Sequence, residues 1–160
     1  MNKVILIGFA TSGKSSVGKL LAARLNAKFV DTDAEIEREC GLTVQQIFDR
    51  YGEGYFRQKE NDLLASLVAE QNVVIACGGG GVLATAFSQL AASGTVVWLT
   101  ATASTAKSRL GGTQRPLFDG LDASQLQQFI EARAPVYKRY ADVTVATDGL
   151  TPEQVAAKIM

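Results

Sequence analysis

An apolar run that leads directly into a glycine-rich loop opens the chain and restricts its fold more than any other segment. Residues 4–7 are continuously apolar, which is typical of a strand covered on both faces. Residues 8–15 read GFATSGKS and fill every fixed position of the spacing G-x-x-x-x-G-K-[ST]. Val17 and Leu21 then begin an apolar stripe at helical spacing. A strand, this loop and a helix in that order predict a phosphate-binding unit.

Each residue type in this loop has a physical task. Gly13 lets the backbone curl, so that its N–H groups converge on phosphate oxygens at the positive end of the following helix. Lys14 can reach the β- and γ-phosphates of a nucleotide, and Ser15 offers a hydroxyl to Mg²⁺. A glycine-rich turn with a coincidental Lys-Ser is the alternative, but the predicted strand and helix supply the context that the motif requires. The motif predicts nucleotide binding and leaves the phosphoryl acceptor open.

Short apolar runs alternate with helical patterns along the rest of the 160 residues. Further strands are predicted at residues 28–31, 73–77, 95–99 and 143–146. Helices are predicted at 33–41, 55–71, 83–92, 104–110 and 123–139, the last of them interrupted by Pro135. A short helix is predicted from the Thr43/Gln46 capping box to residue 52, and a final helix begins at Thr151-Pro152. This alternation implies a parallel sheet with helices on both faces. The length suits one domain over residues 1–160.

The composition excludes several classes of function. Sixteen basic side chains balance sixteen acidic ones, so no net field gathers nucleic acid or an acidic membrane, and we expect neither partner. The absence of His excludes a His base, a His metal site and a Ser-His triad. Cys40 and Cys77 are too few for a disulfide scaffold, so we expect reduced thiols in a cytoplasmic protein. No exposed apolar stripe calls for an obligate dimer, and we expect a monomer.

Two carboxylates follow the second predicted strand. Proteins with this loop usually carry a Mg²⁺-linked Asp at the end of a neighbouring strand, and the third strand offers none. Strand alternation would send Asp31 and Asp33 to the same side, toward the phosphate loop. One could then hold a metal-bound water, while the other orients the acceptor hydroxyl and accepts its proton. The alternative is that Asp33 simply caps the next helix.

Arginines and glycines could form a pocket for an anionic acceptor. Arg57 has Glu60 three residues further on to fix its side chain, and Arg133 lies on a later helix. Two Arg forks suit a carboxylate, because each donates two parallel hydrogen bonds. Residues 78–81 are four glycines, more than a bare turn needs, which indicates backbone N–H groups that touch a ligand. Residues 111–117 contain Arg115 and read as a mobile lid, and Arg109 precedes it.

Taken in order, these residues resemble the shikimate kinase family along residues 4–155. The ordered set is the phosphate loop, Asp31-x-Asp33, Phe56-Arg57-x-x-Glu60, Gly78-Gly79-Gly80, Arg115-Pro116-Leu117 and Arg133 four residues before Tyr137. The resemblance implies a three-layer α/β/α P-loop fold like that of nucleoside-monophosphate kinases, with five parallel strands in the order 2-3-1-4-5. It also implies a lid at about 110–122 and acceptor-binding helices at about 33–61. The implied reaction is ATP plus shikimate giving ADP and shikimate 3-phosphate, a step toward chorismate and the aromatic amino acids.

The same resemblance implies a role for each matching residue. Asp33 would act as the base-like residue, with Lys14 and Arg115 neutralising the transferred phosphoryl group. Mg²⁺ would be held by Ser15 and, through water, by Asp31. ATP would be bound by Gly8, Thr11, Ser12, Gly13, Lys14, Ser15, Ser16, Arg109 (stacked on adenine), Arg115 and Pro152. Shikimate would be bound by Asp33, Arg57, Gly78, Gly79, Gly80, Arg133, Phe48, Phe56 and Glu60.

Two other functions remain open from the residues. A gluconate-type or nucleoside-monophosphate kinase would share the phosphate loop and differ in its acceptor residues. A protein without catalytic activity could bind nucleotide through the same loop and signal through a partner. The pair Arg57 and Arg133 favours an acceptor with a carboxylate, and the presence of Lys14, Asp33 and Arg115 favours catalysis.

Overall fold

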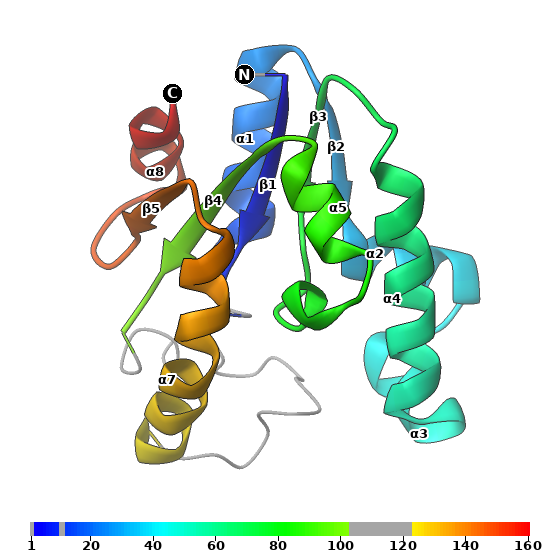
Figure 1. Ribbon diagram of the computed structural model, residues 1–160. Coiled ribbons are helices and arrows are strands. Elements are labelled where there is room, and N and C mark those ends of the chain that lie inside the picture. The colour runs from blue at the N-terminus through cyan, green and yellow to red at the C-terminus, as the bar shows by residue number, and fades with distance from the viewer. Residues whose placement is uncertain (1, 10–11, 103–122) are drawn as a thin grey trace.

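Five parallel strands form the sheet at the centre of the protein (Figure 1). The computed structural model describes residues 2–9, 12–102 and 123–160. The strands are β1 (Lys3–Ile7), β2 (Lys28–Asp31), β3 (Val73–Ala76), β4 (Thr95–Thr100) and β5 (Val143–Ala146). They pair side by side in the order β2-β3-β1-β4-β5, and every pair is parallel. The expected parallel sheet and its strand order are therefore confirmed.

Helices cover both faces of this sheet. They are α1 (Lys14–Leu25), α2 (Thr32–Cys40), α3 (Val44–Tyr51), α4 (Glu53–Leu67), the 3₁₀ turn η1 (Gly81–Leu83), α5 (Phe87–Ala92), α7 (Ala123–Tyr140) and α8 (Pro152–Ile159). α1 and α8 pack on one face, and α4, α5 and α7 pack on the other (Figure 1). The expected three-layer arrangement is confirmed. No helix in the described ranges is both long and apolar enough to span a bilayer.

The central strand β1 shows why the sheet needs helices on both sides. Val4 and Leu6 pack with the α1 and α8 side chains, whereas Ile5 and Ile7 pack with α4, α5 and α7. All four side chains are at most 1% exposed. A strand whose two faces are both apolar is stable only when both faces are covered, because alternate side chains point to opposite sides.

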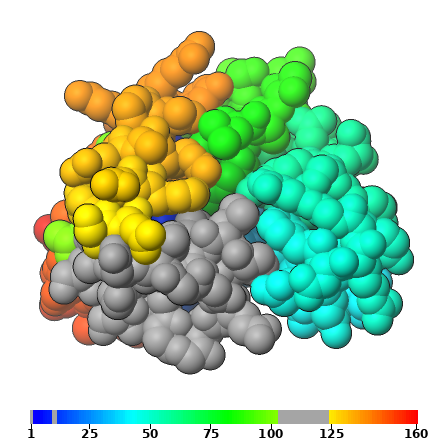
Figure 2. Space-filling model, turned by 90° about the horizontal axis from the view of Figure 1, so that it is seen from below, coloured from blue at the N-terminus to red at the C-terminus, as the bar shows by residue number. Residues whose placement is uncertain are grey.

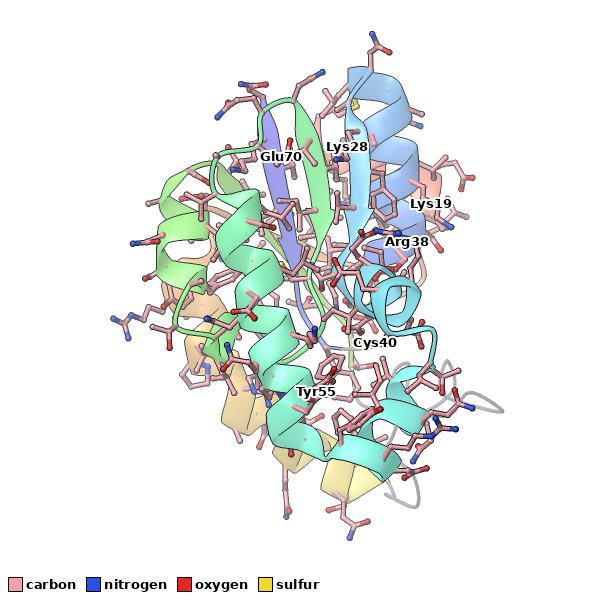
Figure 3. The ribbon with its side chains drawn as sticks, turned by 90° about the vertical axis from the view of Figure 1, so that its right-hand side faces the viewer. Lys19, Lys28, Arg38, Cys40, Tyr55 and Glu70 are labelled. Carbon is pink, nitrogen blue, oxygen red and sulfur yellow. The ribbon has the colours of Figure 1, made fainter. Side chains whose placement is uncertain are left out.

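β2 forms one edge of the sheet, where it continues directly into α2 (Figure 3). At the amino end of this edge, Lys28 and Glu70 form an ion pair of 3.9 Å between side chains that are 61% and 44% exposed. A pair this exposed contributes at most about 1 kcal/mol to stability. The edge is therefore held by the pairing of β2 with β3 and by the packing of α2 rather than by surface charge.

Three helix predictions differ from the structure. The helix expected at 55–71 runs from Glu53 to Leu67. The helix expected at 83–92 begins only at Phe87, since the glycine run ends in the turn η1 and Ala84 is extended. Leu83, taken as helical, is 60% exposed. The helix expected to break at Pro135 instead runs unbroken through it as α7. Pro135 lies on the exposed side of α7, so the carbonyl that loses its donor can face water. The helix predicted at 104–110 lies outside the described residues.

Seen from the carboxyl ends of the strands, α7 lies on one side of the molecule and α3 with α4 on the other (Figure 2). In parallel α/β sheets, ligands bind outside the carboxyl ends of the strands. The phosphate loop follows β1 at this end, Asp31 ends β2, and the glycine run follows β3. The fold therefore brings the candidate residues to one end of the sheet.

Candidate active site

The phosphate loop has the geometry that its sequence requires. Gly8 has φ of 145°, and a Cβ there would lie 2.4 Å from the carbonyl oxygen of Leu99, so only glycine fits. Gly13 is in the left-handed conformation at φ of 88° and is the N-cap of α1. The first turn of α1, whose N–H groups have no partner within the helix, therefore follows the loop directly. Such N–H groups are what binds an anion at a helix N-terminus. Thr11, also expected to contact ATP, lies outside the described residues.

Lys14 is folded back over the loop. Its Nζ donates to the carbonyl oxygens of Gly8 at 2.7 Å and Phe9 at 2.8 Å, and its side chain is 7% exposed. The ammonium group is therefore held where bound phosphates would meet it. Ser15 and Ser16 are exposed in the first turn of α1, while Ser12, within the loop, is buried.

Asp31 connects the phosphate loop to α2. The Ser15 hydroxyl donates to Asp31 Oδ2, and Asp31 Oδ1 accepts from Ala34 N at 3.1 Å. Asp31 is thus the N-cap of α2, so the alternative that Asp33 caps this helix is wrong. The prediction that strand alternation sends Asp31 and Asp33 to the same side does not apply, because β2 ends at Asp31 and α2 begins at the next residue. A hydroxyl and a carboxylate in contact are oxygen donors of the kind that Mg²⁺ takes.

Asp33 lies in the first turn of α2 and points at the glycine run. A Cβ on Gly78 would lie 2.5 Å from Asp33 Oδ1, so a side chain at this glycine would displace the carboxylate. Gly78 N donates to the hydroxyl of Thr32 at 2.9 Å. Both contacts place the end of β2 against the end of β3, although 46 residues separate Thr32 from Gly78.

The two predicted arginines meet at residues 78–81, which we call the glycine turn. Arg133 Nη1 donates to the carbonyl oxygen of Gly79 at 2.7 Å. Arg57 lies against Gly80, where a Cβ would be 2.5 Å from Arg57 Nη1. The guanidinium groups of α4 and α7 therefore reach neighbouring residues of one turn.

Arg57 is held by carboxylates of its own helix. Its Nη1 donates to Glu60 Oε1 at 2.9 Å and its Nε to Glu53 Oε2 at 3.3 Å. Glu60 is 1% exposed, and burial raises the pKa of its carboxyl against the opposing effect of the Arg57 charge. Glu60 Oε2 has no hydrogen-bond partner among the described residues. The expected pairing of Glu60 with Arg57 is present, and Glu53 is a second partner that the sequence interpretation missed.

Aromatic rings lie beside both arginines. Phe48 and Phe56 pack with ring centroids 5.4 Å apart, and the Arg57 guanidinium lies 5.4 Å from the Phe56 ring centroid. The Arg133 guanidinium lies 5.1 Å from that of Phe129. Guanidinium groups over aromatic faces keep a fixed orientation without losing their charge.

The structure does not place every predicted site residue beside the phosphate loop and the glycine turn. Pro152 is the first residue of α8, after the Thr151 cap, and is exposed. Arg109, Arg115 and the expected lid lie outside the described residues. Sequence interpretation assigned no task to Thr32 or Tyr137. Two features of the sequence could have pointed to them. Thr32 lies between two candidate carboxylates, and Tyr137 lies one helical turn after Arg133.

The strand order, the phosphate loop at the end of β1 and the carboxylates beside it define a P-loop phosphotransferase. A family model for shikimate kinase matches residues 10–160. A shikimate kinase of Francisella philomiragia is 41% identical over 160 residues, covering 98% of this chain and 91% of that protein. The chain belongs to the shikimate kinase family.

Solved structures agree with this placement. A shikimate kinase from Acinetobacter baumannii in complex with shikimate matches with a TM-score of 0.93 at 31% identity, covering 99% of this chain and 90% of that one. A gluconokinase from Sinorhizobium meliloti matches with a TM-score of 0.56 at 18% identity, covering 98% of this chain and 87% of that one. At that identity the gluconokinase shares the fold alone.

Proposed function

We propose that this chain transfers the γ-phosphate of ATP to the 3-hydroxyl of shikimate. The observation that carries the proposal is the convergence of Arg57 and Arg133 on one glycine turn, beside Asp33. Two guanidinium groups favour a carboxylate, which shikimate has and a nucleobase lacks. Asp33 faces the same turn and suits a hydroxyl of the acceptor.

In this proposal three groups of residues form the acceptor pocket around Asp33. Arg57 and Arg133 pair with the carboxylate, and Glu60 keeps Arg57 in place. Phe48 and Phe56 form the apolar wall. Gly78, Gly79 and Gly80 allow close approach of the backbone, because a side chain at Gly78 or Gly80 would collide with Asp33 or Arg57.

The reaction forms a bond from the acceptor oxygen to the γ-phosphorus and breaks the bond from that phosphorus to the β,γ-bridging oxygen, which leaves with ADP. Asp33 orients the acceptor hydroxyl and takes its proton. Lys14 moves from the loop carbonyls to the phosphates, and Arg115 adds a second positive charge. Mg²⁺, held by Ser15 and through water by Asp31, would supply charge neutralisation of the β- and γ-phosphates.

The nucleotide would lie along the loop that follows β1. Gly8, Thr11, Ser12, Gly13 and Ser16 would line its phosphates, and Arg109 and Pro152 would contact the base. The left-handed Gly13 and the exposed first turn of α1 support the phosphate part of this assignment.

ADP release with ATP, Mg²⁺ and different acceptors tests the proposal. We expect release with shikimate, and none above background with quinate, gluconate, AMP, UMP or no acceptor. Release with another acceptor alone would keep the kinase and refute the acceptor. Nucleotide binding without release for any acceptor would refute catalysis and favour a nucleotide-binding protein that signals through a partner.

We also propose that residues 1–160 act as a single domain and a monomer in the cytoplasm, on a small molecule and without a nucleic-acid or membrane partner. The balance of sixteen basic and sixteen acidic side chains supports the last point. Light scattering after size-exclusion chromatography should give one species near 17.0 kDa. A species of twice that mass would refute the monomer.

A further inference from the structure

The carbonyl oxygen of Gly79 accepts two hydrogen bonds, both from α7. Tyr137 Oη donates at 2.6 Å and Arg133 Nη1 at 2.7 Å. The two donors are four residues apart, and therefore lie one above the other on the same helix face. A carbonyl oxygen has two lone pairs, so this pair of donors saturates it. Tyr137 reaches across 58 residues of sequence to make its bond.

Fixing this carbonyl also fixes the next N–H. The peptide bonds of the described chain contain no cis isomer, so the Gly80 N–H points opposite to the Gly79 carbonyl and hence away from α7. Gly80 is buried, yet its N–H donates to no atom in the described part of the chain. A buried donor without a protein partner is costly unless a ligand or an ordered water accepts from it. The direction of the Gly80 N–H therefore decides whether this group can donate to a bound acceptor.

Tyr137 is suited to hold this peptide plane permanently. Its side chain is 3% exposed, and its ring packs 5.8 Å from that of Trp98 on β4. Burial raises the pKa of the phenol from 10.0 to about 12, so the hydroxyl stays a hydrogen-bond donor well into the alkaline range. Arg133, in contrast, has two tasks in the proposed function, since it must also meet the acceptor carboxylate. A second donor keeps the carbonyl in place when the guanidinium turns toward the ligand.

We propose that Tyr137 is a positioning residue for the phosphoryl acceptor: its hydroxyl locks the Gly79–Gly80 peptide so that Arg133 and the Gly80 N–H face the acceptor correctly. This inference rests on the proposed function, because it assigns Tyr137 to the same pocket. It predicts that Tyr137 acts on acceptor binding and has no direct part in ATP binding.

Tyr137→Phe tests the inference, because it removes the hydroxyl and keeps the ring in its packing. Loss of one neutral hydrogen bond corresponds to about a fivefold loss of affinity. We expect the KM for shikimate to rise by about that factor, while the KM for ATP and kcat at saturating shikimate stay close to wild type. Tm should fall by only a few degrees (about 2–4 °C), as expected for the loss of one buried hydrogen bond. Tyr140→Phe is the matched control. It removes the same atom from the same helix, where the hydroxyl makes no hydrogen bond with a described residue and the ring packs 4.9 Å from Phe87.

Calorimetric titration with shikimate in the absence of ATP separates the possible failures. If the wild type turns shikimate over and Tyr137→Phe leaves both its KM and its Kd unchanged, the inference is wrong and the proposed function stands. If the KM values for ATP and shikimate rise together, Tyr137 is structural only, and the inference is again wrong. If the wild type neither binds nor phosphorylates shikimate, the proposed function fails and the inference fails with it.

Discussion

A methyl group added at Gly80 perturbs the proposed acceptor pocket without straining the backbone. Gly80 has φ of −94° and ψ of 0°, a conformation open to alanine. The new Cβ would lie 2.5 Å from Arg57 Nη1 and 2.8 Å from Arg57 Cζ, closer than van der Waals contact allows. The guanidinium must move by about 1 Å to reach an ordinary contact distance. That movement opposes its bonds to buried Glu60 at 2.9 Å and to Glu53 at 3.3 Å.

The size of the effect follows from this displacement. A shift of about 1 Å in a group that positions a substrate can lower the rate by up to about 100-fold. We expect Gly80→Ala to reduce kcat/KM for shikimate by about 10- to 100-fold, which is about 1.4–2.7 kcal/mol of transition-state stabilisation. The KM for ATP should not change, because the phosphate loop is untouched.

Coupled measurement of ADP release over a range of shikimate concentrations gives this ratio directly. Gly54→Ala is the matched control, since Gly54 lies in the first turn of α4 and a Cβ there meets no atom within 4 Å. The control should keep full activity and be no less stable than wild type, because alanine is the better helix former. A Gly80→Ala variant whose kcat/KM for shikimate is within twofold of wild type would refute the placement of Arg57 in the acceptor pocket.

Three further predictions concern the base, the sheet and pH. Asp33→Asn should lower kcat at least about 100-fold with ATP affinity unchanged, because the proton acceptor is lost; full activity in a single-turnover assay would rule out the catalytic role. Lys3→Met should lower the free energy of unfolding by about 1–3 kcal/mol. The reason is that buried Lys3 Nζ donates to the carbonyl oxygens of Leu67 at 2.7 Å and Val68 at 2.8 Å. A urea denaturation curve that matches wild type would contradict this. The pKa of Tyr137 is raised from 10.0 to about 12 by burial, so the native state keeps a proton that the unfolded chain releases. The resulting stabilisation is complete below pH 10.0 and is lost as pH rises to about 12. Urea denaturation at about pH 9 and about pH 11 should show a smaller fall in stability for Tyr137→Phe than for wild type, and equal falls would refute the assignment.

The sheet could be predicted because its strands carry strong local signals. The run at residues 4–7 is apolar on both faces, and the structure buries both faces of β1. The Thr43/Gln46 capping box and the Thr151-Pro152 pair mark the starts of α3 and α8 correctly. The strand order came from the family resemblance, because local patterns do not determine which parallel strands become neighbours.

Other features depend on contacts that local sequence does not contain. Asp31 and Asp33 are both acceptable caps by residue type, and only the end of β2 decides that Asp31 takes the role. The bonds of Thr32 to Gly78 and of Tyr137 to Gly79 span 46 and 58 residues. The glycine run favours a turn, but its contacts with Asp33, Arg57 and α7 come from residues distant in the sequence. The sequence thus indicated which residues gather at the site, and tertiary hydrogen bonds decide how they are held.

Mass spectrometry of the acceptor after incubation with the protein, ATP and Mg²⁺ tests the central claim most directly. The account predicts that shikimate gains one phosphoryl group in a one-to-one ratio with the ADP formed, and that Asp33→Asn forms both products at least about 100-fold more slowly. ADP that accumulates while shikimate stays unmodified would mean hydrolysis of ATP and would contradict the proposed transfer to this acceptor.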